Sequence, residues 1–364
     1  MSAQSVKFLI FADFHYKKRM YASTISDLNR ILKRAADENV DFVIHAGDFC
    51  NEYVISPEVK EAYLHNKYGL KVYGICGNHE LEHMNMPHEE PLDGEHPMQY
   101  FAPFLTNDIN GVVWGTADGK PAAHWEIAYY HFDRKGIRFV CADTQYSYSE
   151  ARGAWEHNPD LNAPKGNICT ESLGPVQRVW LESVLIDAAR RNIPCVVFSH
   201  SAFAKGWANS HEHAAARELF GRINAIRKGT VIAAVNGHRH SDNDAEMIDG
   251  VLYLDINSAL NGWWQRESEA HYGPEHTFDF EDYDKDGNYL GTKKLSYGAL
   301  SMGGQTWFFR DPLSAVVTVA EDGRVTVDGM ETEWAYGIAP PAETAGTLYF
   351  VRPRITSGTY KAER

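Results

Sequence analysis

Five short polar clusters in this sequence hold side chains of the types that bind metal ions, and each cluster follows an apolar stretch. Their carboxylate, amide and imidazole groups make a mixed oxygen and nitrogen donor set. Such a set favours manganese, iron, cobalt, nickel or zinc over copper(I), magnesium or calcium. The clusters are Asp13-Phe14-His15, Gly47-Asp48-Phe49-Cys50-Asn51, Gly77-Asn78-His79-Glu80, Ser199-His200 and Gly237-His238-Arg239-His240.

The segments around these clusters predict alternating strands and helices. Short apolar runs are typical of buried strands, and apolar residues at helical spacing predict the helices between them. A repeated β-α-β order gives parallel strands with right-handed crossovers, so the sequence predicts an α/β fold. The expected strands are Val6–Ala12, Asp41–Ala46, Lys71–Cys76, Ile137–Ala142, Cys195–Ser199, Thr230–Val235, 244–249 and 251–257, and the expected helices are 21–38, 57–69, Pro175–Arg191 and 211–228.

The spacing of the clusters predicts that they meet at one edge of the sheet. Asp48 comes 35 residues after Asp13, Asn78 comes 30 residues after Asp48, and His238 comes 38 residues after His200. A β-α-β unit takes about 30 residues or more, so each step returns to the carboxyl ends of the strands, where ligands bind. Seven donors are more than one ion needs, which predicts two ions that share a bridging carboxylate. The convergent set is Asp13, His15, Asp48, Asn78, His200, His238 and His240.

The charge of the chain limits its partners. It has 364 residues, 49 of them acidic and 35 basic, and a net charge of −14. This balance argues against a nucleic-acid polymer or an anionic membrane as partner, because both are held by Lys and Arg. Two divalent ions would nevertheless leave the cleft locally cationic, even with two aspartates and a bound hydroxide. An anion such as phosphate would therefore be attracted there.

The sequence also predicts a cytoplasmic protein. No apolar run reaches the roughly 18 residues of a membrane span, and Phe8–Ala12, which Asp13 interrupts, is too short for a signal peptide. The five cysteines show no CxxC spacing, and Cys76, Cys141 and Cys195, in or beside apolar runs, are expected to be core residues in a reducing compartment. His45 lies inside an apolar run and is expected to be a core residue and not a ligand.

Two regions fall outside the alternating pattern. Residues 81–135 are rich in His, Pro and aromatic residues without a sustained period, which predicts an insertion or lid. We place a domain boundary near residue 260, with a catalytic domain over 1–260 and a C-terminal extension over 261–364. Within the extension, apolar stretches on either side of Asp322-Gly323 predict a β-hairpin. Both regions are expected to shape the substrate pocket, and the extension alternatively serves oligomerisation.

The five motifs, in this order, resemble those of the calcineurin-like metallophosphoesterase superfamily over roughly residues 6–258. The resemblance implies a four-layer αββα sandwich of two mixed sheets. It also implies a dinuclear centre, with manganese, iron or zinc as the expected metals. One ion would be held by Asp13, His15 and His240.

For the other ion, the resemblance implies Asn78, His200 and His238 as ligands, with Asp48 as the bridge. His79 matches the substrate-facing histidine of the family, which contacts the phosphate or assists the leaving group. Asp48 and His79 are therefore the expected catalytic residues, and Asn78 and His79 the expected substrate contacts. The implied reaction is attack of a metal-bound hydroxide on the phosphorus of a small phosphate ester.

Departures from particular branches narrow the substrate. Protein phosphatases continue the second motif with Asp-Arg-Gly, whereas Asn51-Glu52-Tyr53 follows it here. This difference argues against a phosphoprotein substrate. Purple acid phosphatases have a tyrosine at the position of Asn51. The Asp-x-His start with Gly-Asn-His-Glu is similar to the bacterial cyclic-nucleotide and glycerophosphodiester phosphodiesterase branch, so a phosphodiester is the expected substrate.

Other functions remain open at this point. A phosphomonoesterase or a nucleotide pyrophosphatase needs the same ligands. A catalytically silent scaffold with this fold is an alternative of a different class, although such a scaffold is expected to have lost ligands and none is lost here. A metal-dependent amidohydrolase is a further alternative, but its His-x-His pair is expected after the first strand, and here the pair comes last.

Overall fold

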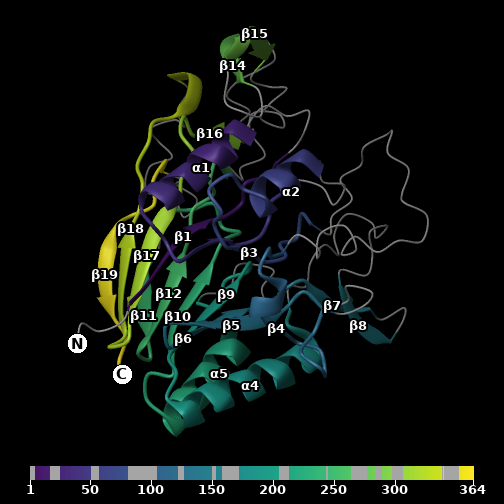
Figure 1. Ribbon diagram of the computed structural model, residues 1–364, viewed down its shortest axis with the longest axis vertical. Helices are drawn as coiled ribbons and strands as arrows, with labels where there is room; N and C mark the ends of the chain where they lie inside the picture. Colours follow the sequence, from purple (N-terminus) through teal and green to yellow (C-terminus); the bar gives the residue numbers. More distant parts are fainter. Residues whose placement is uncertain are drawn as a thin grey trace.

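The computed structural model shows two β-sheets packed face to face with helices on both outer sides (Figure 1). Helices α1 and α2 cover one sheet, and α4 and α5 cover the other. This arrangement confirms the predicted sandwich of two mixed sheets. The structure describes residues 5–16, 25–50, 57–80, 105–121, 127–149, 153–157, 172–204, 213–242, 245–263, 277–283, 289–296, 306–337, 339 and 352–364.

The first sheet has the strand order β19-β18-β17-β1-β2-β3. Strands β1, β2 and β3 are parallel, as predicted, and α1 and α2 lie in the connections between them. Helix α1 buries Leu28, Ile31, Leu32 and Ala35, the apolar residues at helical spacing. The bounds are β1 Ser5–Phe11, α1 Ile25–Asp37, β2 Phe42–His45, α2 Pro57–Leu64, β3 Val72–Gly74, β17 Ala315–Ala320, β18 Arg324–Asp328 and β19 Gly358–Lys361.

The second sheet has the order β11-β12-β10-β9-β6-β5-β4. Its central strands β6, β9, β10 and β12 are parallel, and antiparallel strands flank them on both sides. Helices α4 and α5 pack on its outer face. The bounds are β4 Val113–Trp114, β5 Tyr130–Arg134, β6 Ile137–Cys141, α4 Gly174–Arg191, β9 Cys195–Ser199, α5 His213–Ile226, β10 Val231–Asn236, β11 Glu246–Ile248 and β12 Val251–Asp255.

Strands β4 and β5 lie within residues 81–135, where the sequence predicted an irregular insertion. The described part of that region instead extends the second sheet, because β5 pairs antiparallel with β6. Buried Tyr130 and Phe132 alternate in β5 with the more exposed His131 and Asp133. This alternation is typical of a half-buried strand. The polar residues of the region make it hard to recognise in the sequence. Residues 81–104 lie outside the described part of the chain.

Strands β17, β18 and β19 come after residue 260 and nevertheless complete the first sheet. Strand β17 pairs antiparallel with β1, where Ser5 lies opposite Ala320. The predicted hairpin around Asp322-Gly323 is confirmed, because β17 and β18 pair antiparallel, and Gly323 adopts a positive φ of 83° in the turn. The last three strands therefore extend the first sheet outward from β1, with β17 as its direct neighbour.

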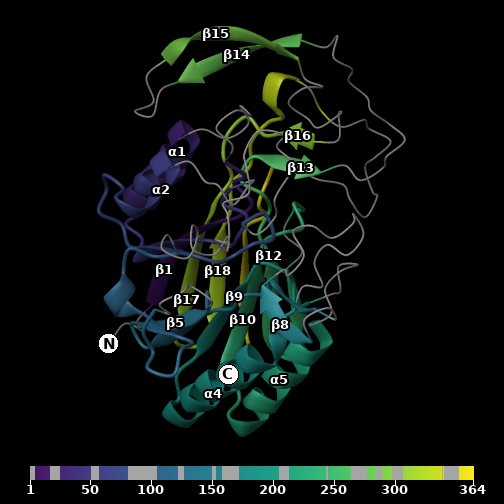
Figure 2. The same ribbon diagram turned by 90° about the vertical axis from the view of Figure 1, so that its right-hand side faces the viewer.

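Three small two-stranded sheets and two short 3-10 helices complete the described elements. The hairpin of β14 and β15 lies at one end of the molecule, beyond α1 (Figure 2). Among the described helices, none is long and apolar enough to cross a membrane. The bounds are η2 Ile109–Gly111, β7 Tyr146–Ser149, β8 Ala154–His157, β13 Asn261–Trp263, β14 Thr277–Tyr283, β15 Tyr289–Ser296, β16 Thr306–Phe308 and η3 Ala335–Gly337.

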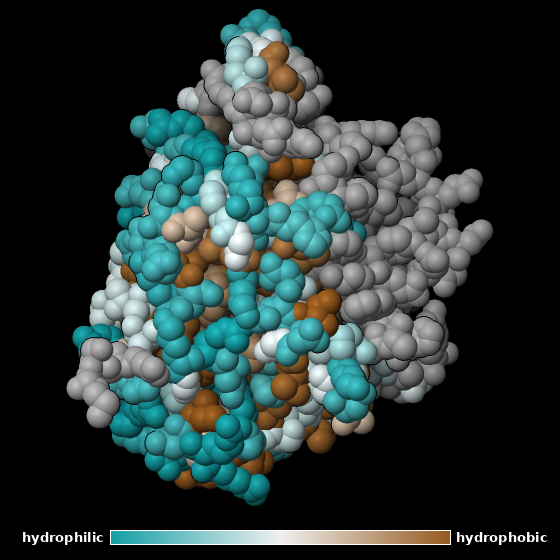
Figure 3. Space-filling view, viewed as in Figure 1, coloured by the Kyte–Doolittle hydropathy of each residue, from teal (hydrophilic) through white to brown (hydrophobic). Residues whose placement is uncertain are grey.

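Aromatic side chains fill the space between the two sheets. The ring of Phe8 in β1 packs edge-on against Phe139 and Phe198 of the second sheet, with ring centroids 5.7 Å and 5.6 Å apart. Such pairs stabilise a core beyond the area that they bury. The face of the molecule shown in Figure 3 is covered mainly by hydrophilic residues, with apolar ones among them.

The buried titratable groups of the core behave as predicted. His45 has no exposed surface and packs its ring against Phe49, with centroids 4.8 Å apart. Burial lowers the pKa of His45 to about 3, so its ring stays neutral. Of the cysteines, Cys50, Cys76, Cys141 and Cys195 are buried and form no disulfide, and Cys169 lies outside the described residues.

Candidate metal centre

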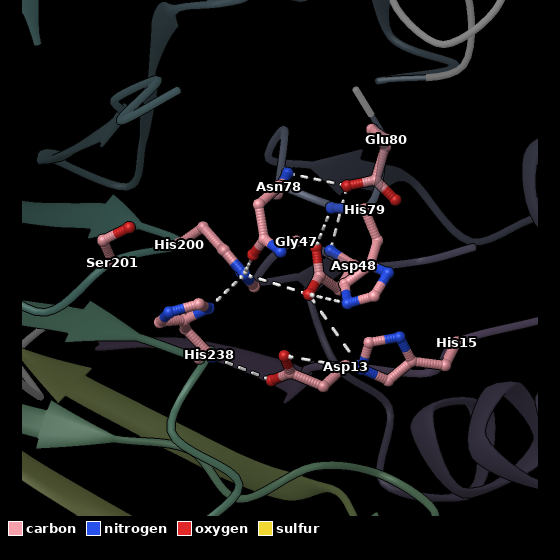
Figure 4. A network of polar contacts seen from close by, with 12 residues as sticks. Asp13, His15, Gly47, Asp48, Asn78, His79, Glu80, His200, Ser201 and His238 are labelled. Atoms are coloured by element: carbon pink, nitrogen blue, oxygen red, sulfur yellow. Dashed lines mark hydrogen bonds and ion pairs between the residues drawn. The ribbon is translucent and has the colours of Figure 1, made fainter. Parts of the chain in front are cut away.

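The structure brings all seven predicted ligands together at the carboxyl ends of five strands. Figure 4 labels these residues except His240. The loop after β1 carries Asp13 and His15, and the loops after β2 and β3 carry Asp48 and Asn78. His200 follows β9, while His238 and His240 follow β10. Parallel strands place their carboxyl ends at one sheet edge, and both sheets contribute here.

One group of donors consists of Asp13, His15 and His240. The Oδ1 atom of Asp13 lies 3.3 Å from Nε2 of His240 and 4.0 Å from Nε2 of His15, and the two Nε2 atoms lie 3.1 Å apart. All three side chains are buried. One carboxylate oxygen and two imidazole nitrogens thus converge on one point, as ligands of a single ion would.

A second group surrounds His200. Its Nε2 atom lies 3.1 Å from Nδ1 of His238, 3.1 Å from Oδ1 of Asn78 and 3.2 Å from Oδ2 of Asp48. The side chains of Asp48, His200 and His238 are close enough to hold one cation. The amide oxygen of Asn78 adds a further oxygen donor to this group.

Asp48 lies between the two groups. Besides its contact with His200, its Oδ2 atom lies 3.9 Å from Nε2 of His15 in the first group and 3.9 Å from Nε2 of His79. Asp48 therefore lies within ion-pair distance of histidines from both groups. This is the position that a bridging ligand requires.

Backbone carbonyl groups orient two of the histidines. Nδ1 of His200 lies 2.7 Å from the carbonyl oxygen of Ala46, and Nδ1 of His240 lies 3.1 Å from that of Asn261. A carbonyl oxygen only accepts, so both Nδ1 atoms donate, and in the neutral rings the lone pair at Nε2 faces the site. Metal-bound histidines are usually held in this way.

The donor set fits a cation. Oδ1 of Asp13 is buried, faces Nε2 of His240 and receives no hydrogen bond from the described residues. Burial opposes the charged form of His200, but the charge and hydrogen bond of Asp48 and the charge of Asp13 raise the pKa of this histidine to about 10. The carboxylates thus favour a positive charge at this point. A divalent cation bound by several of these donors would supply that charge.

Strained backbone conformations place most of these ligands. A left-handed φ in a non-glycine residue costs about 1–3 kcal/mol and persists only where the surroundings hold it. Hydrogen bonds across the loops do so: the His238 N–H donates to Asp13 Oδ2 at 2.9 Å, and the His79 N–H donates to Asp48 Oδ1 at 2.9 Å. The strained ligands are Asp13, His15, Asp48, His238 and His240, with φ between 47° and 72°.

Glu80 supports the site in a way that the sequence analysis missed. Its buried carboxylate accepts the backbone N–H groups of Asp48, Cys50 and Gly77 at 3.0, 3.1 and 2.6 Å. Burial and the nearby charge of Asp48 raise the pKa of Glu80 to about 8, against the lowering effect of the N–H donors. The sequence signal for this role was the place of Glu80 at the end of the Gly-Asn-His-Glu motif.

His79 lies at the rim of the centre. Its side chain is 12% exposed, and its ring meets that of His15 edge-on with centroids 4.6 Å apart. The backbone N–H of His79 donates to Oδ1 of Asp48, and the imidazole lies close enough to His15 and Asp48 to form a third possible donor group with them. Asn51, which bore on the branch assignment, lies outside the described residues.

Comparisons with known proteins bear on the fold and on the family of the chain. None of the curated proteins compared with the chain is significantly similar to it. A dimetal phosphatase from Danio rerio has 15% identity and a TM-score of 0.51, over 89% of this chain and 95% of its own. The GAP50 anchor in the inner membrane complex of Plasmodium has 10% identity and a TM-score of 0.40, over 99% and 89%. A 5'-nucleotidase from Candida albicans has 12% identity and a TM-score of 0.38, over 82% and 53%.

At 15% identity the dimetal phosphatase shows a similar fold and nothing about function. The sequence speaks for the family, since the model of the calcineurin-like phosphoesterases matches residues 6–242, which is more than half of the chain. That matched region contains all of the predicted ligands and His79. The chain therefore belongs to the calcineurin-like phosphoesterase family and is a metal-dependent phosphoesterase.

Proposed function

We propose that this enzyme hydrolyses small phosphodiesters with two metal ions. The observation that carries the proposal is the position of Asp48 between two groups of donors, with His79 beside it at the exposed rim. The resemblance of the motifs to those of the bacterial cyclic-nucleotide and glycerophosphodiester phosphodiesterases supports a phosphodiester as the substrate. The donor set supports manganese, iron or zinc, and the cytoplasmic location stays a prediction.

Each ligand has a role in this proposal. Asp13, His15 and His240 hold one ion, and Asn78, His200 and His238 hold the other, with Asp48 shared. When bound, two such ions lower the pKa of water and neutralise the charge that develops on a phosphate group. Asn78 and His79, on the loop after β3, contact the substrate.

His79 acts on the leaving group in this proposal. An alkoxide is a poor leaving group, so its departure is faster when a positioned acid donates a proton to its oxygen. The His79 imidazole is held through its own backbone by Asp48 and is partly exposed. These features are those of a proton donor that reaches a substrate on the ions.

The first test compares bis-p-nitrophenyl phosphate with p-nitrophenyl phosphate as substrates of the manganese-loaded protein. We expect the diester to have the larger kcat/KM. A larger kcat/KM for the monoester would replace the proposal with a phosphomonoesterase or nucleotide pyrophosphatase. Bound metal without hydrolysis of these esters or of a panel of cyclic nucleotides and glycerophosphodiesters would favour the silent scaffold.

His79→Asn is expected to affect substrates differently according to their leaving group. With an alkyl leaving group, kcat should fall by about 10²–10⁴-fold, the usual contribution of general acid catalysis. With p-nitrophenolate, which leaves without a proton, the fall should be much smaller. The measurement compares kcat for a diester with an alkyl leaving group and for bis-p-nitrophenyl phosphate, at equal metal content. An equal loss on both would assign His79 a structural or binding role.

A further inference from the structure

The loop from Asn236 to Asp242 carries two predicted ligands in strained conformations. His238 and His240 have φ values of 72° and 47°. Each such conformation costs about 1–3 kcal/mol, so contacts from elsewhere must hold the loop in this form. The groups that supply those contacts therefore decide whether the two histidines are ready to bind an ion.

One set of contacts that fixes the loop comes from Asp255, at the end of β12. Asp255 is buried, and its Oδ1 accepts a hydrogen bond from the side-chain amide of Asn236 at 2.5 Å. Its Oδ2 accepts from the guanidinium of Arg239, the residue between the two histidines. Asp255 thus fixes the beginning and the middle of the loop from within the second sheet.

Besides the bonds of His238 to Asp13 and of His240 to the Asn261 carbonyl, a further set of contacts comes from the C-terminal part of the chain. Asp242, two residues after His240, accepts a hydrogen bond from Nε of Arg354 at 2.5 Å and one from the hydroxyl of Thr356 at 3.0 Å. The Asp242 side chain is only 15% exposed in this pair, and that of Arg354 is 33% exposed. Arg354 comes 112 residues after Asp242, the last residue that the family model matches.

The segment that carries Arg354 is itself tied to the framework of the site. The side-chain amide of Asn257 donates to the carbonyl oxygens of Arg352 and Arg354 at 2.8 and 3.0 Å. The next residue, Ser258, donates from its hydroxyl to the carbonyl oxygen of Asp13 at 2.9 Å. Arg354 is therefore presented to Asp242 from a fixed backbone, anchored next to the first ligand loop.

We propose that Arg354 is a positioning residue for the ligands His238 and His240. By holding Asp242 it keeps the loop in its strained, binding-ready form, so a segment beyond the region matched by the family model sets the metal affinity of the centre. This inference rests on the assignment of the two histidines as metal ligands. It gives the C-terminal extension a role in the metal site as well as in the first sheet.

The test is titration of the metal-free protein with Mn²⁺ by calorimetry, at a temperature where every variant is folded. Arg354→Met should weaken Mn²⁺ binding by about tenfold, within the range seen when groups behind metal ligands are changed. Arg354→Lys should restore part of the loss. Lys361→Met is the matched control, because it removes the Lys361–Asp322 ion pair on β19, away from the loop, and should bind as the wild type does.

The outcomes separate this inference from the proposed function. If the wild type binds two Mn²⁺ ions and Arg354→Met binds them equally well, the inference is wrong. If the wild type binds no Mn²⁺, the metal assignment itself fails. Should Arg354→Met not fold, Thr356→Val removes a smaller contact to the same Asp242 carboxylate and must weaken binding in the same direction; unchanged binding in that variant would also overturn the inference.

Discussion

Asp48→Asn is expected to abolish the binding of two metal ions and to lower kcat for phosphodiester hydrolysis by about 10³-fold or more. The reason is the place of its carboxylate, which lies 3.2 Å from His200 and 3.9 Å from His15, between the two donor groups. An amide has no negative charge to share between two cations. Metal analysis of the purified variant should find at most one ion per chain, against two in the wild type.

The fold of this variant should survive. The charge of Asp48 opposes ionisation of Asp13 and Glu80, so the repulsion that its removal relieves offsets part of the attraction to His200 and His79 that is lost. Circular dichroism and thermal unfolding in the presence of a chelator check this point. Two bound ions together with wild-type activity in Asp48→Asn would contradict the bridging role.

Asp143→Asn is the matched control for this experiment. Asp143 is fully buried and follows β6, the neighbour of β9, at the same edge of the second sheet. Its Oδ1 accepts a hydrogen bond from the backbone N–H of Gln145 at 2.9 Å, and it is no predicted ligand. We expect Asp143→Asn to keep both ions, which would show that the loss is specific to Asp48.

The convergence of the ligands was predictable because it depends on local signals. Apolar runs such as Phe42–His45 are too short and too continuous for anything but buried strands, and helical spacing fills the intervals between them. Parallel strands then place every following cluster at one edge. The assignment of ligands to each of the two ions, in contrast, came from the family resemblance and not from this pattern.

Long-range pairings could not be read from the sequence in the same way. Strand β17 lies beside β1 with Ser5 opposite Ala320, and no local pattern says which apolar strand fills that edge. The pair of Asp242 with Arg354 depends on that arrangement, since it joins residues 112 positions apart. Glu80 was visible in its motif, but its role depends on backbone N–H groups that three separate positions present to it.

Close packing around His200 gives the second large prediction. Gly47 has a φ of 92°, and a Cβ atom there would lie 2.3 Å from Nδ1 of His200. That nitrogen donates to the carbonyl oxygen of Ala46, the contact that turns Nε2 toward the site. A side chain at position 47 would therefore displace the ring at the centre of the second donor group.

Gly47→Ala should lower the free energy of unfolding by about 2–4 kcal/mol, because backbone strain and steric crowding add. It should also weaken the metal affinity of the folded protein, since His200 no longer reaches the ion. Denaturant unfolding and Mn²⁺ titration measure the two effects separately.

Gly69→Ala separates strain from crowding in that experiment. Gly69 also has a positive φ, 66°, but a Cβ atom there meets no atom of the described residues within 4 Å. In this variant the backbone strain alone should lower the free energy of unfolding, by about 1–2 kcal/mol. Metal binding should stay as in the wild type. The difference between the two variants is then the cost of displacing His200. If Gly47→Ala loses no more stability than Gly69→Ala and keeps its metal affinity, the ring of His200 is not fixed by the glycine, and the orientation of this ligand must come from the Ala46 carbonyl alone.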